Sequence, residues 1–173
     1  MKKVFSLVLM ALFVSQLAIA NELSVSPAVA VNFADEFKTA VSVGAKVNAE
    51  ALPFGLPKEV VVSSGLTYAQ LETNDGSLQD TDLFTIPVEV GYKYAIDEKL
   101  SVKPYVGLDF ILVNSHAVDN TVGGHLGAEF SYQIKENLSA ELNAGWRFAE
   151  IDVNGESKSL NGAVLGGSVS YKF

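Results

Sequence analysis

Hydrophobic and polar residues alternate with a period of two along most of the chain, from Leu23 to Phe173. Such alternation is typical of β-strands, because successive side chains of a strand point to opposite faces of the sheet. Each run is long enough to cross a bilayer as a tilted strand, and the number of runs is even. The pattern predicts an all-β fold, an eight-stranded antiparallel up-and-down transmembrane β-barrel. The runs cover residues 23–33, 37–48, 60–68, 84–94, 100–112, 122–134, 138–148 and 165–173.

The alternation alone does not say which face is wet, because a soluble lipocalin-like barrel has the same period with its apolar face inside. Two observations favour an apolar face in lipid. Every charged residue of the runs lies on the polar parity, and a lipid-facing Lys or Arg at mid-depth would cost about 2–4 kcal/mol. The polar parity is also rich in glycine, which suits the narrow lumen of an eight-stranded barrel but would weaken a solvated strand. These glycines are Gly44, Gly65, Gly91, Gly107, Gly123, Gly127, Gly145, Gly162 and Gly166.

The aromatic residues of the apolar face give a third reason. When odd strands run outward from the periplasm, these aromatics sort into two groups by height, with aliphatic residues between them. Two aromatic girdles around an aliphatic band are what the two membrane–water interfaces favour. The expected outer girdle is Phe33, Phe37, Tyr68, Phe84, Phe110, Trp146 and Phe148. The expected periplasmic girdle is Tyr92, Tyr94, Tyr132, Tyr171 and Phe173, with Phe130 just above it.

The connections between the runs also alternate in length. The short ones, 95–99 and 135–137, suit periplasmic turns, and the longer acidic ones, 72–82 and 150–160, suit outer loops. Two connections depart from this rule, a short outer loop at 34–36 and a long inner segment at 51–59. Pro27, Pro87 and Pro104 fall inside runs, where each removes one ladder hydrogen bond, so bulges or local irregularity are expected there.

The first twenty residues have the layout of a secretory signal peptide. Lys2 and Lys3 precede an apolar run from Val4 to Val14, and Ala18-Ile19-Ala20 supplies the small residues before a cleavage site. This apolar run is shorter than the roughly 20 residues of a transmembrane helix, although an uncleaved anchor helix is the alternative. The domains expected are a cleaved signal peptide at 1–20 and an outer-membrane β-barrel domain at 21–173, beginning at Asn21.

Charge and cysteine content exclude several classes of function. Without Lys2 and Lys3, the 12 basic side chains become 10, against 20 acidic ones, so the mature chain carries a formal charge of −10. Nucleic-acid binding is not expected at this charge, because it needs Lys and Arg to neutralise phosphates. The chain has no cysteine, which excludes a disulfide scaffold and a thiolate metal site.

The last seven residues, from Gly167 to Phe173, end in Phe with Tyr171 two positions earlier. This ending resembles the terminal strand of bacterial outer-membrane proteins, in which the barrel-assembly machinery is thought to read the aromatic signature. With the leader and the eight runs, the whole mature chain resembles the OmpA/OmpX-like outer-membrane β-barrel superfamily. The resemblance implies an outer-membrane location, and an assembly signal at Tyr171 and Phe173. A counterpart of the peptidoglycan-binding domain of full-length OmpA relatives is not expected in this chain.

Charged residues of the inward parity are expected to meet inside the barrel. Asp109 and His125 are each eight residues from Ala117, and His125 and Arg147 are each eleven from Glu136. Residues equidistant from a turn lie opposite each other in an antiparallel pair, which predicts the row Asp109–His125–Arg147. A slip of two residues would make these contacts diagonal, whereas a slip of one would put the charges in lipid.

A second group is expected below this row. Lys103 is predicted to lie diagonal to both Glu89 and Glu129, with Tyr105 between those two acids, and Glu141 also points inward. The functional interpretation of these residues is a proton relay or a gated pore. The structural interpretation, which we favour, is a charge network that fills and seals a narrow barrel, since buried charges need partners.

Other candidate sites have weaker support. His116, near Ser115 and Asp119, could belong to a lipid A deacylase-like site, but sequence neighbours rarely form a Ser–His–acid arrangement, and an ordinary loop residue is favoured. The acidic outer loops could bind calcium, or bridge to lipopolysaccharide through divalent cations, although a solvated acidic surface is favoured. Their acids are Glu72, Asp75, Asp80, Asp82, Glu150, Asp152 and Glu156.

The sequence therefore predicts a non-enzymatic integral outer-membrane protein with a role in envelope integrity or surface interaction, closed to large solutes. A lipid A-modifying enzyme of the same architecture and a soluble periplasmic ligand-binding barrel are the alternatives. No catalytic residue, metal site or cofactor is expected, since phosphate-loop, zinc and nucleotide motifs are missing. The expected partners are outer-membrane lipid, lipopolysaccharide and the barrel-assembly machinery, and the protein is expected to be a monomer.

Overall fold

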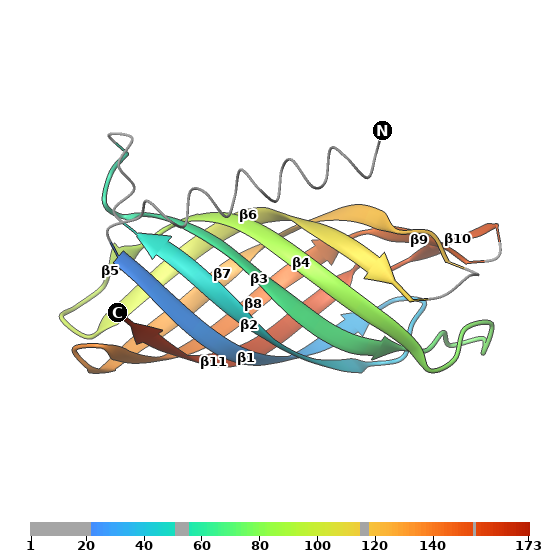
Figure 1. Cartoon of the computed structure of the whole chain (residues 1–173), viewed down its shortest axis with the longest axis horizontal. Coiled ribbons are helices and arrows are strands. Elements are labelled where there is room, and N and C mark those ends of the chain that lie inside the picture. Colours follow the sequence, from blue (N-terminus) through green and yellow to red (C-terminus); the bar gives the residue numbers. More distant parts are fainter. Residues whose placement is uncertain (1–21, 51–55, 115–117, 154) are drawn as a thin grey trace.

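The computed structural model describes residues 22–50, 56–114, 118–153 and 155–173, and in these ranges its regular elements are all β-strands (Figure 1). Eight of them are long and correspond to the eight alternating runs. β5 is a two-residue extension, and β9 and β10 form a separate hairpin. The strands are β1 (Glu22–Ala34), β2 (Ala40–Glu50), β3 (Val60–Leu71), β4 (Thr81–Tyr92), β5 (Tyr94–Ala95), β6 (Leu100–Val113), β7 (Thr121–Lys135), β8 (Leu138–Phe148), β9 (Glu150–Val153), β10 (Glu156–Ser159) and β11 (Gly162–Lys172).

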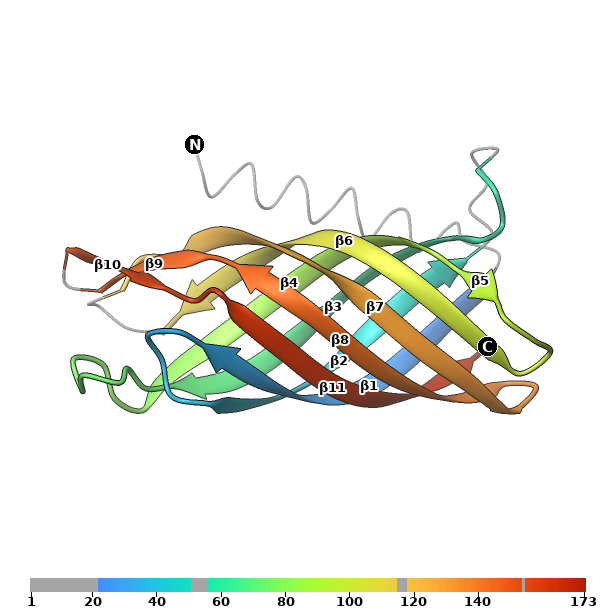
Figure 2. The same ribbon diagram turned by 180° about the vertical axis from the view of Figure 1, so that it is seen from behind.

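The eight long strands close into a barrel in which every neighbouring pair is antiparallel. Each strand pairs with the next along the chain, in the order β4-β3-β2-β1-β11-β8-β7-β6, and the pairing of β4 with β6 completes the ring. The first and last strands meet at a seam where Val29 lies opposite Gly167 and Phe33 opposite Ala163. The two opposite views show tilted strands on all sides (Figure 1 and Figure 2). The predicted eight-stranded up-and-down barrel is confirmed.

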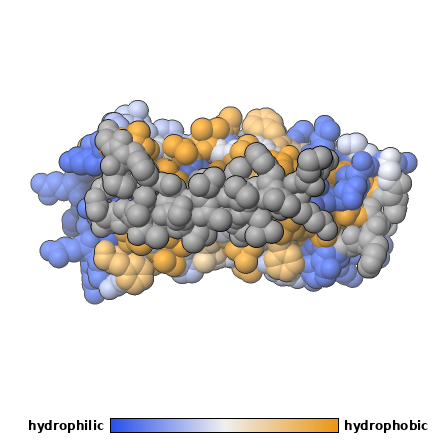
Figure 3. Space-filling model, turned by 45° about the horizontal axis from the view of Figure 1, so that its top comes forward, coloured by the Kyte–Doolittle hydropathy of each residue, from blue (hydrophilic) through white to orange (hydrophobic). Residues whose placement is uncertain are grey.

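The apolar parity of the strands faces outward, as predicted. Val106 and Leu142, in the middle of β6 and β8, are 61% and 68% exposed, whereas Asp109 of the other parity is 1% exposed. Hydrophobic side chains form a band along the sides of the described surface, and hydrophilic ones gather at its two ends (Figure 3). A soluble barrel would bury this face, so the soluble alternative is excluded.

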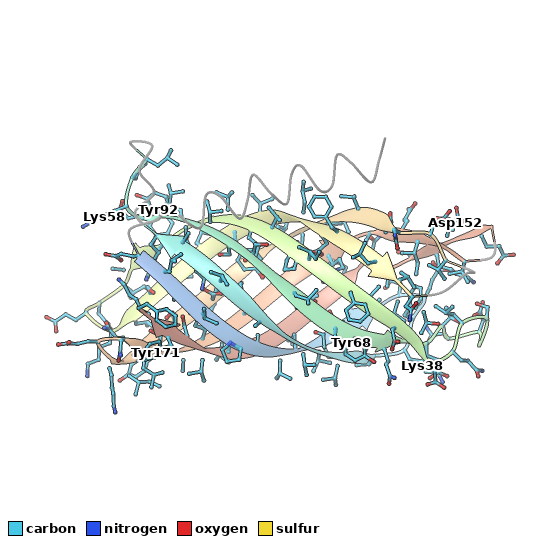
Figure 4. All side chains as sticks on the ribbon, viewed as in Figure 1. Lys38, Lys58, Tyr68, Tyr92, Asp152 and Tyr171 are labelled. Atoms are coloured by element: carbon cyan, nitrogen blue, oxygen red, sulfur yellow. The ribbon has the colours of Figure 1, made fainter. Side chains whose placement is uncertain are left out.

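Aromatic residues lie towards both ends of this apolar band. Tyr92 and Tyr171 lie near the end with the short turns, and Tyr68 lies towards the opposite end (Figure 4). Tyr68 packs on Phe84 with ring centroids 5.3 Å apart, and Tyr92 packs on Tyr94 at 4.6 Å. Such amphipathic rings suit the headgroup regions of a bilayer.

An apolar cluster closes the barrel at its outer end, above the membrane-facing band. We call this cluster the outer apolar cap. Strand ends, the 72–80 loop and the β9–β10 hairpin all contribute to it, and Ile111, Ile151 and Val153 are at most 1% exposed. The cap consists of Phe37, Leu71, Leu78, Leu83, Ile111, Val118, Ala149, Ile151, Val153 and Leu160.

The placement of Phe37 in the lipid-facing girdle was wrong, because its side chain is 3% exposed inside the outer apolar cap. β2 begins only at Ala40, and Phe37 forms an isolated bridge with Thr73 of the next outer loop. Phe37 lies outside β2, and the alternation of β2 does not continue into the residues before Ala40. Counting back from β2 therefore places the Phe37 side chain on the wrong face of the wall.

The short connections are the 96–99 turn between β5 and β6 and the Glu136–Asn137 turn between β7 and β8. The described strands show the predicted local irregularity at two of the prolines, but without a bulge. Ladder pairs are missing beside Pro27 and Pro87 on one side, and the register is the same before and after each gap. At Pro104 neither was found on the side of β7, where it lies opposite Ala128 in an unbroken ladder. The register shift that does occur lies between Gln133 and Lys135. The described part of the chain holds no helix long and apolar enough to cross a membrane.

Candidate functional site: the charged lumen

Asp109, on β6, is the most deeply buried acid in the lumen. Arg147 donates through Nε to its Oδ2 at 2.7 Å, and Nδ1 of His125 lies 3.0 Å from its Oδ1. Arg147 also donates through a second nitrogen to Oδ1 of Asn32, at 3.5 Å. The imidazole therefore meets Asp109 on one side, and the guanidinium links β6 to β8 and β1.

The predicted register holds for one pair of this row and not for the other. His125 lies opposite Arg147, as predicted. Asp109 lies opposite Gly123, and His125 opposite Gly107, so the expected Asp109–His125 opposition was wrong by two residues. The contact between Asp109 and His125 is diagonal, because the hairpin is centred one residue before Ala117, which itself lies outside the described residues.

A second set of ion pairs crosses the lumen on the periplasmic side of this row. Lys103 lies directly opposite Glu129, with Nζ 2.8 Å from Oε1, so the predicted diagonal placement was wrong. Lys46 reaches across from β2 to bind Oε2 of Glu129, and its Nζ lies 3.7 Å from Oε2 of Glu89. Glu89 also lies 3.4 Å from Nε2 of His125, and so joins the two sets.

We call these seven side chains the central charge layer. They come from β2, β4, β6, β7 and β8, and their ion pairs cross the lumen rather than only following neighbouring strands. Burial of such charges is costly unless each has partners, and here every acid contacts two cationic or imidazole groups. The layer consists of Lys46, Glu89, Lys103, Asp109, His125, Glu129 and Arg147.

Glycines leave the space that the large side chains of the lumen occupy. Tyr105 lies opposite Gly91 and Gly127, and not between the two acids as predicted. A Cβ added at Gly127 would lie 2.6 Å from the Tyr105 hydroxyl, and one at Gly107 would lie 2.6 Å from the ring of His125. The inward glycines are therefore complementary in shape to the aromatic rings beside them.

Glu141 points inward from β8 and forms no direct ion pair with the central charge layer. It is 7% exposed, and Oγ of Ser168 donates to its Oε2 at 2.6 Å. No Lys, Arg or His nitrogen of the described residues lies within 4.0 Å of its carboxylate. It lines a cavity of about 280 Å³ that lies on the periplasmic side of the central charge layer.

Sequence reasoning missed two residues of this site. Neither Lys46 nor Asn32 is among the residues that the sequence predicts for the charged rows. Both have inward parity on their strands, which is the signal that could have found them. Asn32 donates to Oγ of Ser42 at 3.0 Å and accepts from Arg147, so it closes the charge layer on its outer side.

The acids of the outer loops are divided among different partners: Asp75 and Glu156 both lie near Lys158, whereas Glu72 pairs with Lys38. Asp75 accepts from Lys158 at 2.7 Å and from the backbone and hydroxyl of Ser77. The hydrogen bond from Lys158 holds the pKa of Asp75 well below its ordinary value, and the same bond raises the pKa of Lys158. Within the described ranges, no three acids or histidines are grouped as metal ligands. His116 lies outside the described residues.

The chain ends at the periplasmic rim. Tyr171 and Phe173 are exposed on the outer wall, with ring centroids 5.1 Å apart, and the backbone N–H of Phe173 donates to the carbonyl of Leu23 at 3.0 Å. Lys172, between them, points the other way and pairs with Glu22 of β1. The two candidate residues of the assembly signal are thus accessible from outside the barrel.

A closed antiparallel barrel with an aliphatic outer wall, aromatic ends and a charged lumen defines the class of integral outer-membrane β-barrel proteins. The chain belongs to the family of the outer membrane protein beta-barrel domain, whose family model matches residues 4–173. It is accordingly an outer-membrane protein, as predicted. No curated protein matches the sequence.

Solved structures agree with this fold at low sequence identity. The N-terminal β-barrel domain of Pseudomonas aeruginosa OprF is 11% identical, with a TM-score of 0.59 over 89% of this chain and 98% of that one. Neisserial surface protein A (NspA) is 14% identical, with a TM-score of 0.61 over 88% and 96%. Ail, the attachment invasion locus protein of Yersinia pestis, is 16% identical, with a TM-score of 0.56 over 89% and 99%.

Proposed function

We propose that this protein is a non-enzymatic outer-membrane barrel whose lumen is sealed to large solutes, and that it serves envelope integrity. The observation that carries this proposal is the central charge layer, in which Lys46 reaches across from β2 to Glu129 on β7. An eight-stranded barrel leaves an interior just wide enough for side chains, so ion pairs that cross it occupy the path a solute would need.

The outer apolar cap supports the same proposal independently. A polar solute entering from outside would have to pass buried Ile111, Ile151 and Val153 before it reached the charge layer. Between the cap and Arg147 there is a cavity of only about 20 Å³, roughly the space of one water molecule. Two barriers of different chemistry thus lie in series.

Liposome swelling tests the seal. Vesicles containing the purified barrel should swell in arabinose or sucrose no faster than protein-free vesicles, whereas vesicles containing a large general porin should swell rapidly. A matched variant, Lys46→Ala with Lys103→Ala, removes both lysines of the central charge layer and leaves the outer apolar cap intact. It should remain impermeable to sucrose. Sugar influx through the unmodified barrel would overturn the sealed-lumen proposal.

Support for a non-enzymatic role comes from the position of His125. A lipid A-modifying enzyme needs a nucleophile and base accessible to lipid on the outer wall. The side chain of His125 is 10% exposed and lies in the lumen between Asp109 and Glu89. The acylation pattern of lipid A should therefore be the same in a deletion strain and its parent. If the acylation pattern of lipid A differs between the deletion strain and its parent, the lipid A-modifying enzyme is favoured instead.

The outer end also suits a surface-interaction role. The β9–β10 hairpin projects from the barrel beyond β8 (Figure 2), its base lies in the outer apolar cap, and its tip carries exposed acids such as Glu156. Such a hairpin presents a charged tip on a rigid support. Ail, of the same fold, is named for attachment and invasion. Loss of binding to host or neighbouring cells on deletion of residues 152–157 would support this role.

The remaining parts of the proposal concern biogenesis and surroundings. We propose that residues 1–20 are removed on export, so that mass spectrometry of the envelope protein should find Asn21 at the N-terminus. The barrel-assembly machinery would insert the chain as a monomer into outer-membrane lipid and lipopolysaccharide, with no cofactor. Detection of residues 1–20 in the membrane-inserted protein would contradict the cleavage.

A further inference from the structure

The strand pairing between β7 and β8 does not continue to the outer rim of the barrel. Its last pair is Gly124 with Phe148, and the next contact between the two edges is an isolated bridge between Val118 and Val153. Between these two points there are five residues on one side and four on the other. One regular ladder cannot pair five residues with four, and the wall opens here into a groove.

This groove, which we call the rim groove, has a volume of about 650 Å³. Small-molecule sites typically have volumes of about 300–1,000 Å³. A Cβ added at Gly123 would lie 2.7 Å from that of Ala149, so the two edges are still close there and separate only beyond it. Val122 and Phe148 of the groove are 56% and 49% exposed on the outer wall, so the groove lies where the apolar band meets the polar end. The rim groove is lined by residues 119–122 and 148–152, Ser157 and Asn161.

The polar groups of the rim groove can both donate and accept hydrogen bonds. Thr121 and Ser157 bring hydroxyls, and Ser157 donates to Glu150 at 3.4 Å. Asn120 and Asn161 bring amides, which are held in place because the side-chain oxygen of each accepts a backbone N–H, at 3.0 and 2.9 Å. Apart from the bridge at its end, no ladder joins the two edges of the groove in the described part of the chain. Unpaired edges present backbone N–H and C=O groups as further partners.

The charges around the rim groove disfavour a phosphorylated ligand. Its acids are Asp119, Glu150 and Asp152, and the described residues that line it include no Lys or Arg. Lys158, the one basic residue of the hairpin sequence, lies on the opposite hairpin face, because its strand partner is the buried Ile151. Arg147 points into the lumen towards Asp109. These acids are exposed and are not grouped as metal ligands within the described ranges, so they serve here as acceptors for hydroxyl groups.

We infer that the rim groove binds the uncharged sugar headgroup of a glycolipid in the outer leaflet, with the lipid chains on the wall below. Sugar hydroxyls donate to carboxylates and accept from amides, which matches the mixture of groups in the groove. The C–H face of a sugar ring can pack on the exposed ring of Phe148, and the lipid chains can follow Val122 and Leu126 down β7. The inference does not rest on the sealed lumen, since it concerns the outside of the wall.

NMR titration of the folded barrel in phosphatidylcholine nanodiscs with octyl β-glucoside tests the inference. The wild type should show saturable amide shifts at Thr121, Val122 and Asp152. Octyl dimethylamine oxide, which has the same chain without the sugar, should not produce them. Asp152→Ala should weaken binding about fivefold or more, because it removes an acceptor for the sugar. Glu156→Ala removes the same charge from the opposite face of the same hairpin and should leave binding unchanged. Equal affinity of the wild type and Asp152→Ala would overturn the inference.

Two further measurements use the wild-type protein and do not depend on how a variant folds. Nuclear Overhauser effects should connect the ring protons of the sugar to the ring of Phe148, and contacts from the alkyl chain alone would refute the sugar site. Methyl β-glucoside, the same sugar without the chain, should bind about tenfold more weakly or worse. Equal affinity for both glucosides would overturn the assignment to a glycolipid. Vesicle swelling is a separate measurement, so the seal and the rim groove fail separately.

Discussion

Replacement of Asp109 by Ala should destabilise the barrel more than replacement of Asp109 and Arg147 together. Asp109 is 1% exposed and contacts both Arg147 and His125, so the single change leaves a buried guanidinium without its main partner. Removing one partner of a buried ion pair typically costs about 3–5 kcal/mol. Arg147 keeps a long contact with Asn32 at 3.5 Å, so we expect a value near the lower end, about 3 kcal/mol.

The double variant removes the stranded cation, and His125 still has Glu89 beside it. We therefore expect Asp109→Ala with Arg147→Ala to cost about 1–2 kcal/mol, and the pairwise coupling to be about 2 kcal/mol or more. Equilibrium urea unfolding in lipid vesicles can be followed through Trp146, the single tryptophan, which lies on the lipid-facing wall next to Arg147.

The control is Glu156→Ala on the exposed outer hairpin, which should change the unfolding free energy by less than about 0.5 kcal/mol. If the two single changes add to the double within about 0.5 kcal/mol, the two residues are not coupled and the reasoning about the charge layer fails.

Three further predictions follow from other parts of the molecule. Gly127→Ala should cost about 1–3 kcal/mol, because the new Cβ would lie 2.5 Å from a backbone oxygen, whereas Gly124→Ala on the same strand should be nearly neutral in the same urea assay. Deletion of Phe173 should slow membrane insertion more than it lowers the stability of the inserted barrel; equal periplasmic accumulation of both proteins in pulse–chase would argue against an assembly signal. The pKa of Asp75 is lowered by Lys158, so their contact should stabilise the outer loops fully above the ordinary value of 3.8 and be lost as the pH falls from there through the lowered pKa. An NMR titration of the Asp75 carboxyl that gives an ordinary pKa would contradict this.

The side to which each wall residue points could be predicted from the sequence, because every wall residue faces either lipid or the lumen. Lipid on one side and a narrow polar lumen on the other favour a period of two, and residues such as Val106, which is 61% exposed, and Asp109, which is 1% exposed, follow it. In the turns and loops, alternation no longer predicts which side chains are buried. Phe37 has the spacing of a wall residue but lies in the outer apolar cap, since the turn before β2 resets the parity.

Contacts inside the lumen were harder to predict. Parity excludes a register error of one residue but not of two. Asp109 shows such an error, because it lies opposite Gly123 and not opposite His125 as predicted. The contact of Lys46 with Glu129 joins residues 83 positions apart across the barrel interior. This contact depends on how β2 and β7, which are not neighbours, are staggered relative to each other, and the alternation within one strand does not predict that stagger.

The seam between β1 and β11 has a consequence for biosynthesis. Every strand except these two finds its neighbours among nearby segments, whereas β1 must wait for the last strand to be delivered. A chain arrested before β11 therefore keeps two rows of unsatisfied backbone N–H and C=O groups, which hydrocarbon does not tolerate and other edges readily pair with. Closure therefore requires the complete series of strands: a chain that lacks β11 would leave these backbone groups unpaired, whereas the closed ring has no edge strand in its wall.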